Sequence, residues 1–286
     1  MVAGVALLWG SVGVVIRQVD LPAVALVSAR IWIAAPAVAL FITRTQRQTP
    51  WSWTLTPRLV VNGVILAAHW VTFIAALQRA PIGTVLLITY LAPIGIAALA
   101  PAVLGEVVPT RTKVALAVAV VGIALIAVPA MDGSSADGIV LALVTGTLYV
   151  ALALSNKLLS DEHGGVNLAL WQLLIAGMVL LPFAAFADWG TPTADWVWLG
   201  VLVLVYTAFA FVMYLTALAR LTATRVAVLL YLEPASAVFF GWLLLDEGLT
   251  LSTVVGGVLV LGAGILVARE PVSPDAPFVE VVDAAG

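Results

Sequence analysis

Two charged side chains lie inside stretches of sequence that are otherwise apolar, and they are the first candidates for chemistry. Glu233 stands within the apolar stretch 222–245, about 17 Å from its start at about 1.5 Å per helical residue. Arg30 stands within the apolar stretch 22–42, about 12 Å from its start on the same scale. An ionised group is costly in apolar surroundings, so each residue is a functional-site hypothesis by default.

The chemistry that these two groups offer is the binding of charge. Glu233 is predicted to bind a proton or a cation, or to contact an amine of a substrate. Arg30 is predicted to hold a substrate carboxylate, or to pair with Glu233 across a cavity. The alternatives are structural. Glu233 would then be a hydrogen-bonded carboxyl between helices, and Arg30 would extend its guanidinium along the helix toward an interface.

Polar and aromatic side chains in other apolar stretches are weaker candidates for the same site. A histidine within a span can relay protons because imidazole changes charge near neutral pH, but a lone one is more often a packing residue. The tyrosines either flank a substrate or pack between helices with a bonded hydroxyl. The candidates are Trp9, His69, Trp70, Tyr90, Trp171, Gln172 and Tyr231, followed by Tyr149, Asn156, Tyr206 and Tyr214.

An internal repeat organises these candidates. At a fixed offset of 141 residues, the separation of Tyr90 from Tyr231, several polar positions match without a gap. Random apolar runs match Leu to Leu, but they do not keep an Arg, a Tyr, a Pro and a Glu in one register, so the sequence indicates a duplication. The matched pairs are Leu77 and Leu218, Arg79 and Arg220, Tyr90 and Tyr231, Pro93 and Pro234, and Glu106 and Glu247. Glu233 breaks the symmetry, because the first copy has Ala92 there.

The matched prolines and glutamates are predicted to shape the helices. Pro93 and Pro234 fall within apolar stretches, where each removes a backbone hydrogen bond and permits a kink or hinge. Glu106 and Glu247 each lie just before the next helix, where a negative charge suits the N-terminal helix dipole. We therefore assign both glutamates a structural role.

Composition places the chain in a bilayer. Of 286 residues, 63% are hydrophobic and 9% are charged, with a mean hydropathy of +1.17, whereas soluble domains carry about 25% charged residues. A net charge of −3 without a basic cluster gives no support for nucleic-acid binding. The absence of cysteine excludes thiolate chemistry, and the two distant histidines give little support for a metal site. We predict no metal and no cofactor.

Ten stretches are long and apolar enough to be predicted as membrane spans. They are 2–18, 22–42, 59–78, 82–104, 111–129, 138–157, 166–187, 195–217, 222–245 and 251–268. With both termini in the cytoplasm, nine of the 12 Lys and Arg residues face the cytoplasm, which the positive-inside rule favours. A cleaved signal peptide is the alternative for 2–18, although the first repeat needs this helix to match the second.

The offset spans five helices, an odd number, so the two copies would cross the membrane in opposite senses. The predicted fold is therefore an all-α polytopic membrane protein of ten transmembrane helices in two inverted five-helix repeats, 1–130 and 138–270. A cytoplasmic tail, 271–286, is predicted to be disordered because it is rich in Pro and acidic residues. Transporters use inverted repeats with the substrate site near the midplane.

Several of these motifs resemble the EamA repeat of the drug/metabolite transporter superfamily over about residues 1–270. They are Leu-Trp-Gly-Ser at 8–11, Arg30, Leu-Ala-Pro at 91–93, Leu-Gly-Glu at 104–106, Leu-Glu-Pro at 232–234, Leu-Asp-Glu at 245–247, and the glycine-bearing stretches 111–129 and 251–268. The resemblance implies a ten-helix carrier, and many members export amino acids or other small metabolites. The second copy lacks the Trp-Gly opening and has Trp171-Gln172 near the place of Arg30. Any role for Arg30 therefore comes from the first repeat alone.

The sequence thus predicts a secondary transporter of the cell membrane, not an enzyme, that exports an amino acid or related metabolite by alternating access. No nucleotide-binding loop is present, so proton coupling through Glu233 is the default hypothesis. The alternatives are a membrane scaffold subunit without transport and, with less support, an intramembrane enzyme. The predicted partners are a small-molecule substrate and membrane lipid, and a homodimer remains an open alternative.

Overall fold

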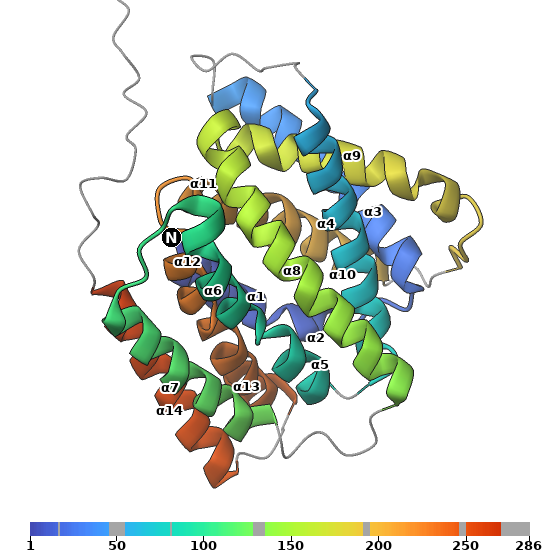
Figure 1. Ribbon diagram of the computed structural model, residues 1–286. Helices are drawn as coiled ribbons and strands as arrows, with labels where there is room; N and C mark the ends of the chain where they lie inside the picture. Colours follow the sequence, from blue (N-terminus) through green and yellow to red (C-terminus); the bar gives the residue numbers. More distant parts are fainter. Residues whose placement is uncertain are drawn as a thin grey trace, which may run out of the picture.

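The computed structural model describes residues 1–16, 18–45, 55–80, 82–127, 135–190, 195–245 and 250–269, and within these ranges every regular element is helical (Figure 1). In chain order the helices are α1 (Val2–Gly10), α2 (Val12–Ile16), α3 (Ala23–Thr45), α4 (Pro57–Leu77), α5 (Ile82–Thr89), α6 (Ala92–Leu104), α7 (Thr110–Ala127), α8 (Ala136–His163), α9 (Gly165–Ala184), α10 (Asp195–Val201), the π-helix η2 (Leu202–Phe209), α11 (Ala210–Leu218), α12 (Ala223–Leu230), α13 (Leu232–Leu245) and α14 (Leu251–Ala268). Glu247 and the predicted tail, 271–286, lie outside the described residues.

Hydroxyl side chains mark the starts of four helices. Thr56, Ser135, Thr222 and Thr250 each accept a hydrogen bond from the backbone N–H three residues later, at α4, α8, α12 and α14 respectively. Such N-caps satisfy a donor that the first helical turn leaves free. These starts therefore follow from local sequence.

Five continuous helical stretches are long and apolar enough to cross a membrane by themselves. They are Ala23–Phe41, Pro57–Leu77, Ala136–His163, Gly165–Ala184 and Asp195–Leu218. Shorter apolar helices, Ala92–Leu104 and Leu251–Val267, accompany them. The predicted all-α membrane class is confirmed, whereas helix length by itself does not establish the predicted ten spans.

Three of the predicted spans are divided into two helices. The stretch 82–104 breaks between α5 and α6 at Tyr90 and Leu91, and 222–245 breaks between α12 and α13 at Tyr231. In each case a proline follows within three residues, and proline cannot donate to the preceding turn. The stretch 2–18 breaks at Ser11, whose Oγ donates to the Leu8 carbonyl at 2.8 Å and so competes with the helical backbone pattern.

Helices that are far apart in the sequence pack side by side. α7 and α14 form the most extensive helix pair and lie along one edge of the molecule, and α3 packs on α9 (Figure 1). In both pairs the two partners are related by the 141-residue offset. Near the centre, α1 packs on α11, α12 and α13.

Small residues let α7 and α14 cross closely. A Cβ at Gly122 would lie 2.7 Å from the Gly256 carbonyl oxygen, and a Cβ at Gly256 would lie 2.8 Å from Ile126 and would collide with the Gly122 carbonyl. The Cβ added at Gly122 would also lie 2.9 Å from a methyl group of Val260. Gly122 thus lies beside Val260, whereas Ile126, one turn further along α7, lies beside Gly256, one turn earlier in α14. The two helices therefore run antiparallel.

Adding a methyl group at this crossing tests the packing. We expect Gly256→Ala to lower the free energy of unfolding by about 1–3 kcal/mol, the usual cost of overpacking, since a backbone carbonyl cannot move aside. Gly257→Ala is the matched control, because nothing lies within 4 Å of a Cβ there. Thermal denaturation of the purified protein in detergent measures both, and equal melting temperatures for the two variants would contradict the crossing.

Candidate functional site

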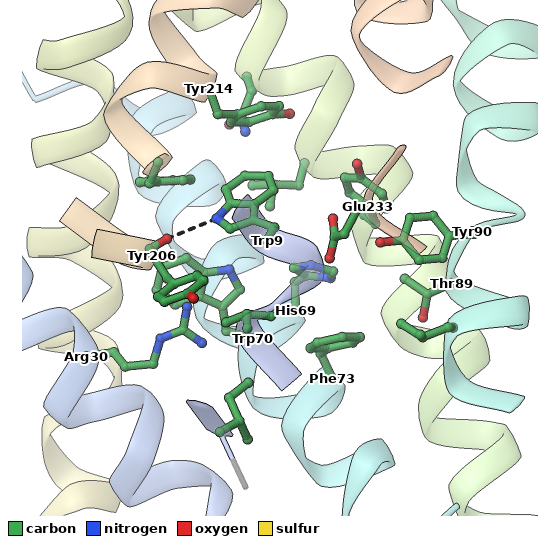
Figure 2. Close-up of a pocket in the computed structure, with 17 residues that line it drawn as sticks. Trp9, Arg30, His69, Trp70, Phe73, Thr89, Tyr90, Tyr206, Tyr214 and Glu233 are labelled. Carbon is green, nitrogen blue, oxygen red and sulfur yellow. Dashed lines mark hydrogen bonds between the residues drawn. The ribbon is translucent and has the colours of Figure 1, made fainter. Parts of the chain in front are cut away.

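A cavity of about 140 Å³ lies at the centre of the helices, and most of its wall is aromatic (Figure 2). Its lining comes from α1, α2, α3, α4, α5, α8, η2, α11, α13 and the turn between α5 and α6. Ionisable groups of opposite sign, the Arg30 guanidinium and the Glu233 carboxyl, line the same space. At about 30 Å³ per water, the cavity has room for roughly five water molecules, which suits a small ligand.

A second cavity, of about 410 Å³, continues from the first toward one end of the helices. The two cavities share Trp9, Tyr90 and Glu233, and the second extends to Asp20 and Gln78. Gln78 directly follows α4, and Asp20 lies between α2 and α3. The central site therefore connects to the end of the molecule at which α4 terminates.

Arg30 is held at the cavity wall by two contacts. Its Nε donates to Thr207 Oγ1 at 3.2 Å, and its guanidinium carbon lies 4.7 Å from the centroid of the Trp70 ring, a cation–π geometry. Thr207 belongs to η2, and its hydroxyl donates to the Leu202 carbonyl five residues earlier at 3.0 Å. π-Helices are frequent at functional sites, and this one places Thr207 opposite Arg30.

Glu233 lies in the first turn of α13, where the helix dipole favours a negative charge. The Tyr90 hydroxyl interacts with its carboxyl and points toward it (Figure 2). Gly10 brings α1 against this turn, since a Cβ at Gly10 would lie 2.7 Å from the Glu233 carbonyl oxygen. Within the described residues no salt bridge joins Arg30 to Glu233, so the direct pairing considered from sequence is absent here.

Tyr90 and Tyr231 meet across the two helix breaks. The Tyr231 hydroxyl donates to the Tyr90 carbonyl at 2.7 Å, and the two ring centroids are 6.0 Å apart. Tyr90 lines the cavity, whereas Tyr231 is fully buried behind it. The break leaves the Tyr90 carbonyl without its helical partner, and Tyr231, which is the equivalent residue in the second repeat, donates to it instead.

Trp9, His69 and Trp70, which are candidates from the sequence, also lie on the cavity wall. Trp9 Nε1 donates to the Tyr206 carbonyl at 3.0 Å and so ties α1 to η2. His69 Nδ1 lies 3.2 Å from the Thr145 carbonyl, which can only accept, so Nδ1 carries the proton. The imidazole stacks on Phe73 and Tyr149, with ring centroids 6.3 and 5.5 Å apart.

Trp171 and Gln172 do not line this cavity, although both are predicted candidates. Both are buried on α9, and the Gln172 amide bonds to Asn62 and Asn156 behind the cavity wall. Asn62 and Thr207 are polar residues that sequence reasoning missed, and so is Thr89, which lines the cavity. An uncharged polar residue within an apolar helix carries no spacing signal that would reveal its neighbours.

Glu106 binds a helix N-terminus, but of a different helix from the one predicted. Its carboxylate accepts hydrogen bonds from Ala223 N at 2.6 Å, Thr224 N at 3.3 Å and Thr224 Oγ1 at 3.1 Å. These donors belong to the first turn of α12, in the second half of the chain, instead of α7. The chain runs from Gln78 through α5 and α6 to Glu106, so this contact lies at the end opposite to the open cavity.

Comparisons with known proteins agree on one family. The pattern of the EamA-like transporter family matches residues 1–128 and 136–269. An "uncharacterized transporter" of Archaeoglobus fulgidus is 28% identical over 92% of this chain and 93% of its own length. The pseudopaline exporter CntI of Pseudomonas aeruginosa is 26% identical over 74% of this chain and 75% of its own length. The threonine/homoserine exporter RhtA of Escherichia coli is 28% identical over 67% of this chain and 64% of its own length.

The fold also has a counterpart among solved structures. A crystal structure that is 16% identical superposes with a TM-score of 0.80 and covers 94% of this chain and 98% of its own. At that level of identity the likeness concerns the arrangement of helices alone.

Glu106 contacts the start of α12 at the end of the molecule opposite to the open cavity, here called the closed end. Removing the Glu106 carboxylate is expected to loosen this end. Because the chain has no cysteine, Ala223→Cys supplies a single reporter for a maleimide. Loss of a helix cap costs about 1 kcal/mol, so Glu106→Ala is expected to raise the labelling rate about fivefold.

Gln78→Cys, at the open end, is the matched reporter, and its labelling is expected to stay the same with and without Glu106. An unchanged rate at Ala223→Cys would show that the hydrogen bonds of Glu106 do not hold this end together.

Proposed function

This chain belongs to the EamA-like transporter family, and from that premise we propose that it is a secondary transporter that exports a small zwitterionic metabolite of the amino-acid class. The central cavity is its substrate site. Arg30 binds the carboxylate of the substrate and Glu233 binds its ammonium group. The aromatic wall encloses the remainder of the molecule.

The observation that carries the proposal is the presence of Arg30 and Glu233 in one cavity without an ion pair between them. A guanidinium forms bidentate hydrogen bonds with a carboxylate, and an ammonium group is stabilised by a carboxylate and by aromatic faces. A zwitterion would therefore satisfy both groups at once. One relative, named as a threonine/homoserine exporter, supports this class of cargo.

Alternating access is supported by the difference between the two ends. The cavity continues to Asp20 and Gln78, whereas Glu106 bridges α6 and α12 at the other end. We assign the open end to the outside, because both termini would then face the cytoplasm together with most basic residues. Transport would break the Glu106 contact and close the opposite end.

We further propose that ten spans form two repeats, 1–130 and 138–270, of opposite orientation in the cytoplasmic membrane. Three features support this arrangement: the antiparallel packing of α7 on α14, the pairing of α3 with α9, and the equivalent breaks at Tyr90 and Tyr231. Inverted repeats of this kind place broken helices around a central site. The half-helices α6 and α13 begin at such breaks.

Glu233 is also our candidate for coupling transport to protons. Its carboxyl lines both cavities and so has a path to the open end. Binding of a proton and binding of a substrate ammonium group would compete for the same carboxylate. Such competition would couple export of the substrate to movement of a proton in the opposite direction across the membrane.

Transport by purified protein in sealed vesicles tests the proposal. The wild type is expected to move labelled amino acids, faster with an imposed pH gradient. Glu233→Gln is expected to lose the stimulation by the gradient and to slow amino-acid counterflow about tenfold, because a neutral hydrogen bond replaces a charge-assisted one.

Glu162→Gln is the matched control, since its carboxylate lies half-exposed at the end of α8. It is expected to behave as the wild type. Absence of amino-acid transport by the wild type, or undiminished stimulation of Glu233→Gln by the gradient, would contradict the proposal.

A further inference from the structure

Three buried amide side chains form a network behind the central cavity. Asn62 on α4, Asn156 on α8 and Gln172 on α9 are each at most 1% exposed. Asn62 Nδ2 donates to Ser155 Oγ at 2.7 Å and to Asn156 Oδ1 at 2.9 Å. Gln172 Nε2 donates to Asn156 Oδ1 at 2.6 Å and also to Asn62 Oδ1. The network joins three helices at one point.

In the hydrogen bonds of the network, the oxygen of the Asn156 amide faces Asn62 and Gln172. Asn156 Oδ1 accepts from two NH₂ groups, those of Asn62 and Gln172. With Asn62 and Gln172 in place, rotating the Asn156 amide alone by half a turn would place its NH₂ against their NH₂ groups, which offer no acceptor lone pair. Asn156 Nδ2 is therefore turned away from the network.

Asn156 also lines the central cavity, so it is the member of the network that can reach a substrate. Among the described residues its Nδ2 has no hydrogen-bond partner. The Tyr214 hydroxyl interacts with the Asn156 amide from the same wall, without the geometry of a hydrogen bond to Nδ2. A buried donor of this kind is stabilised by any ligand that brings an acceptor to it.

We propose that Asn156 Nδ2 selects the substrate, by donating a hydrogen bond to an acceptor oxygen in its side chain. This inference rests on the proposed function and narrows it to amino acids whose side chain carries a hydroxyl, amide or carboxyl oxygen. Arg30 on α3, Glu233 on α13 and Asn156 on α8 provide three points of recognition. Asn62 and Gln172 are positioning residues, which act by fixing the Asn156 amide.

Selection follows from the apolar character of the surrounding wall. An apolar pocket hardly distinguishes two ligands of one shape that differ by a hydroxyl, whereas a site with a buried donor rejects the ligand that leaves this donor unpaired. Threonine and valine form such a pair, and their small size suits a cavity of about 140 Å³. They are therefore the probes for the test.

The experiment measures counterflow of labelled threonine and labelled valine in vesicles containing the full chain. The wild type is expected to favour threonine by at least about tenfold in rate at low concentration, the value of one well-formed hydrogen bond. Asn156→Leu is expected to bring the ratio close to one, through slower threonine transport and a lower KM for valine, because valine then leaves no buried donor unpaired. Gln172→Leu is expected to lower the ratio partially.

Asn156→Leu is compatible with folding, because Asn62 Nδ2 keeps its bond to Ser155 and Gln172 Nε2 keeps its bond to Asn62. Asn167→Leu is the matched control: Asn167 is buried on α9, but it lines neither cavity. This variant is expected to keep the wild-type ratio.

Equal threonine and valine rates in the wild type, or an unchanged ratio in Asn156→Leu, would overturn the inference while leaving the proposed function intact. Transport of neither amino acid would overturn the proposed function, and the inference with it.

Discussion

The structure depends on one constraint: a polar group between apolar helices must find its partner within the protein. Each break in a helix frees backbone groups that lipid cannot satisfy. At Tyr90 the released carbonyl receives the hydroxyl of Tyr231, and at the start of α12 the free N–H groups of Ala223 and Thr224 receive Glu106. The first contact lies at a helix break and the second at a helix start, and both join the two halves of the chain.

The cavity combines groups from helices that are widely separated in the sequence. Arg30 is held by Thr207 from the π-helix, and Glu233 approaches Tyr90 at the edge of another break. Irregular backbone therefore accompanies both charged groups. Regular helices form the supporting frame, in which α7 and α14 pack through glycine. The closely packed outer pair thus contrasts with a centre in which several helices are broken.

Sequence reasoning singled out residues that are unusual for their surroundings, and their role in binding stays a prediction. Arg30, Glu233 and His69 stand out because a charge or an imidazole is rare in an apolar stretch, and all three line the cavity. It was less successful with Trp171 and Gln172, which are polar or aromatic but pack behind the wall. Glu106 shows a third case: its preference for a helix N-terminus is correct, and the helix it binds is α12, which sequence proximity did not suggest.

By itself the sequence determined the helical class, the apolar stretches, the duplication and the residues whose charge demands a partner, because all of these depend on composition and spacing along the chain. Only the tertiary structure decided which partners those residues find. The bond from Tyr231 to Tyr90, the amide network of Asn62, Asn156 and Gln172, and the separation of Arg30 from Glu233 depend on how helices cross. Crossing is set by side-chain packing in three dimensions, to which distance along the chain is a poor guide.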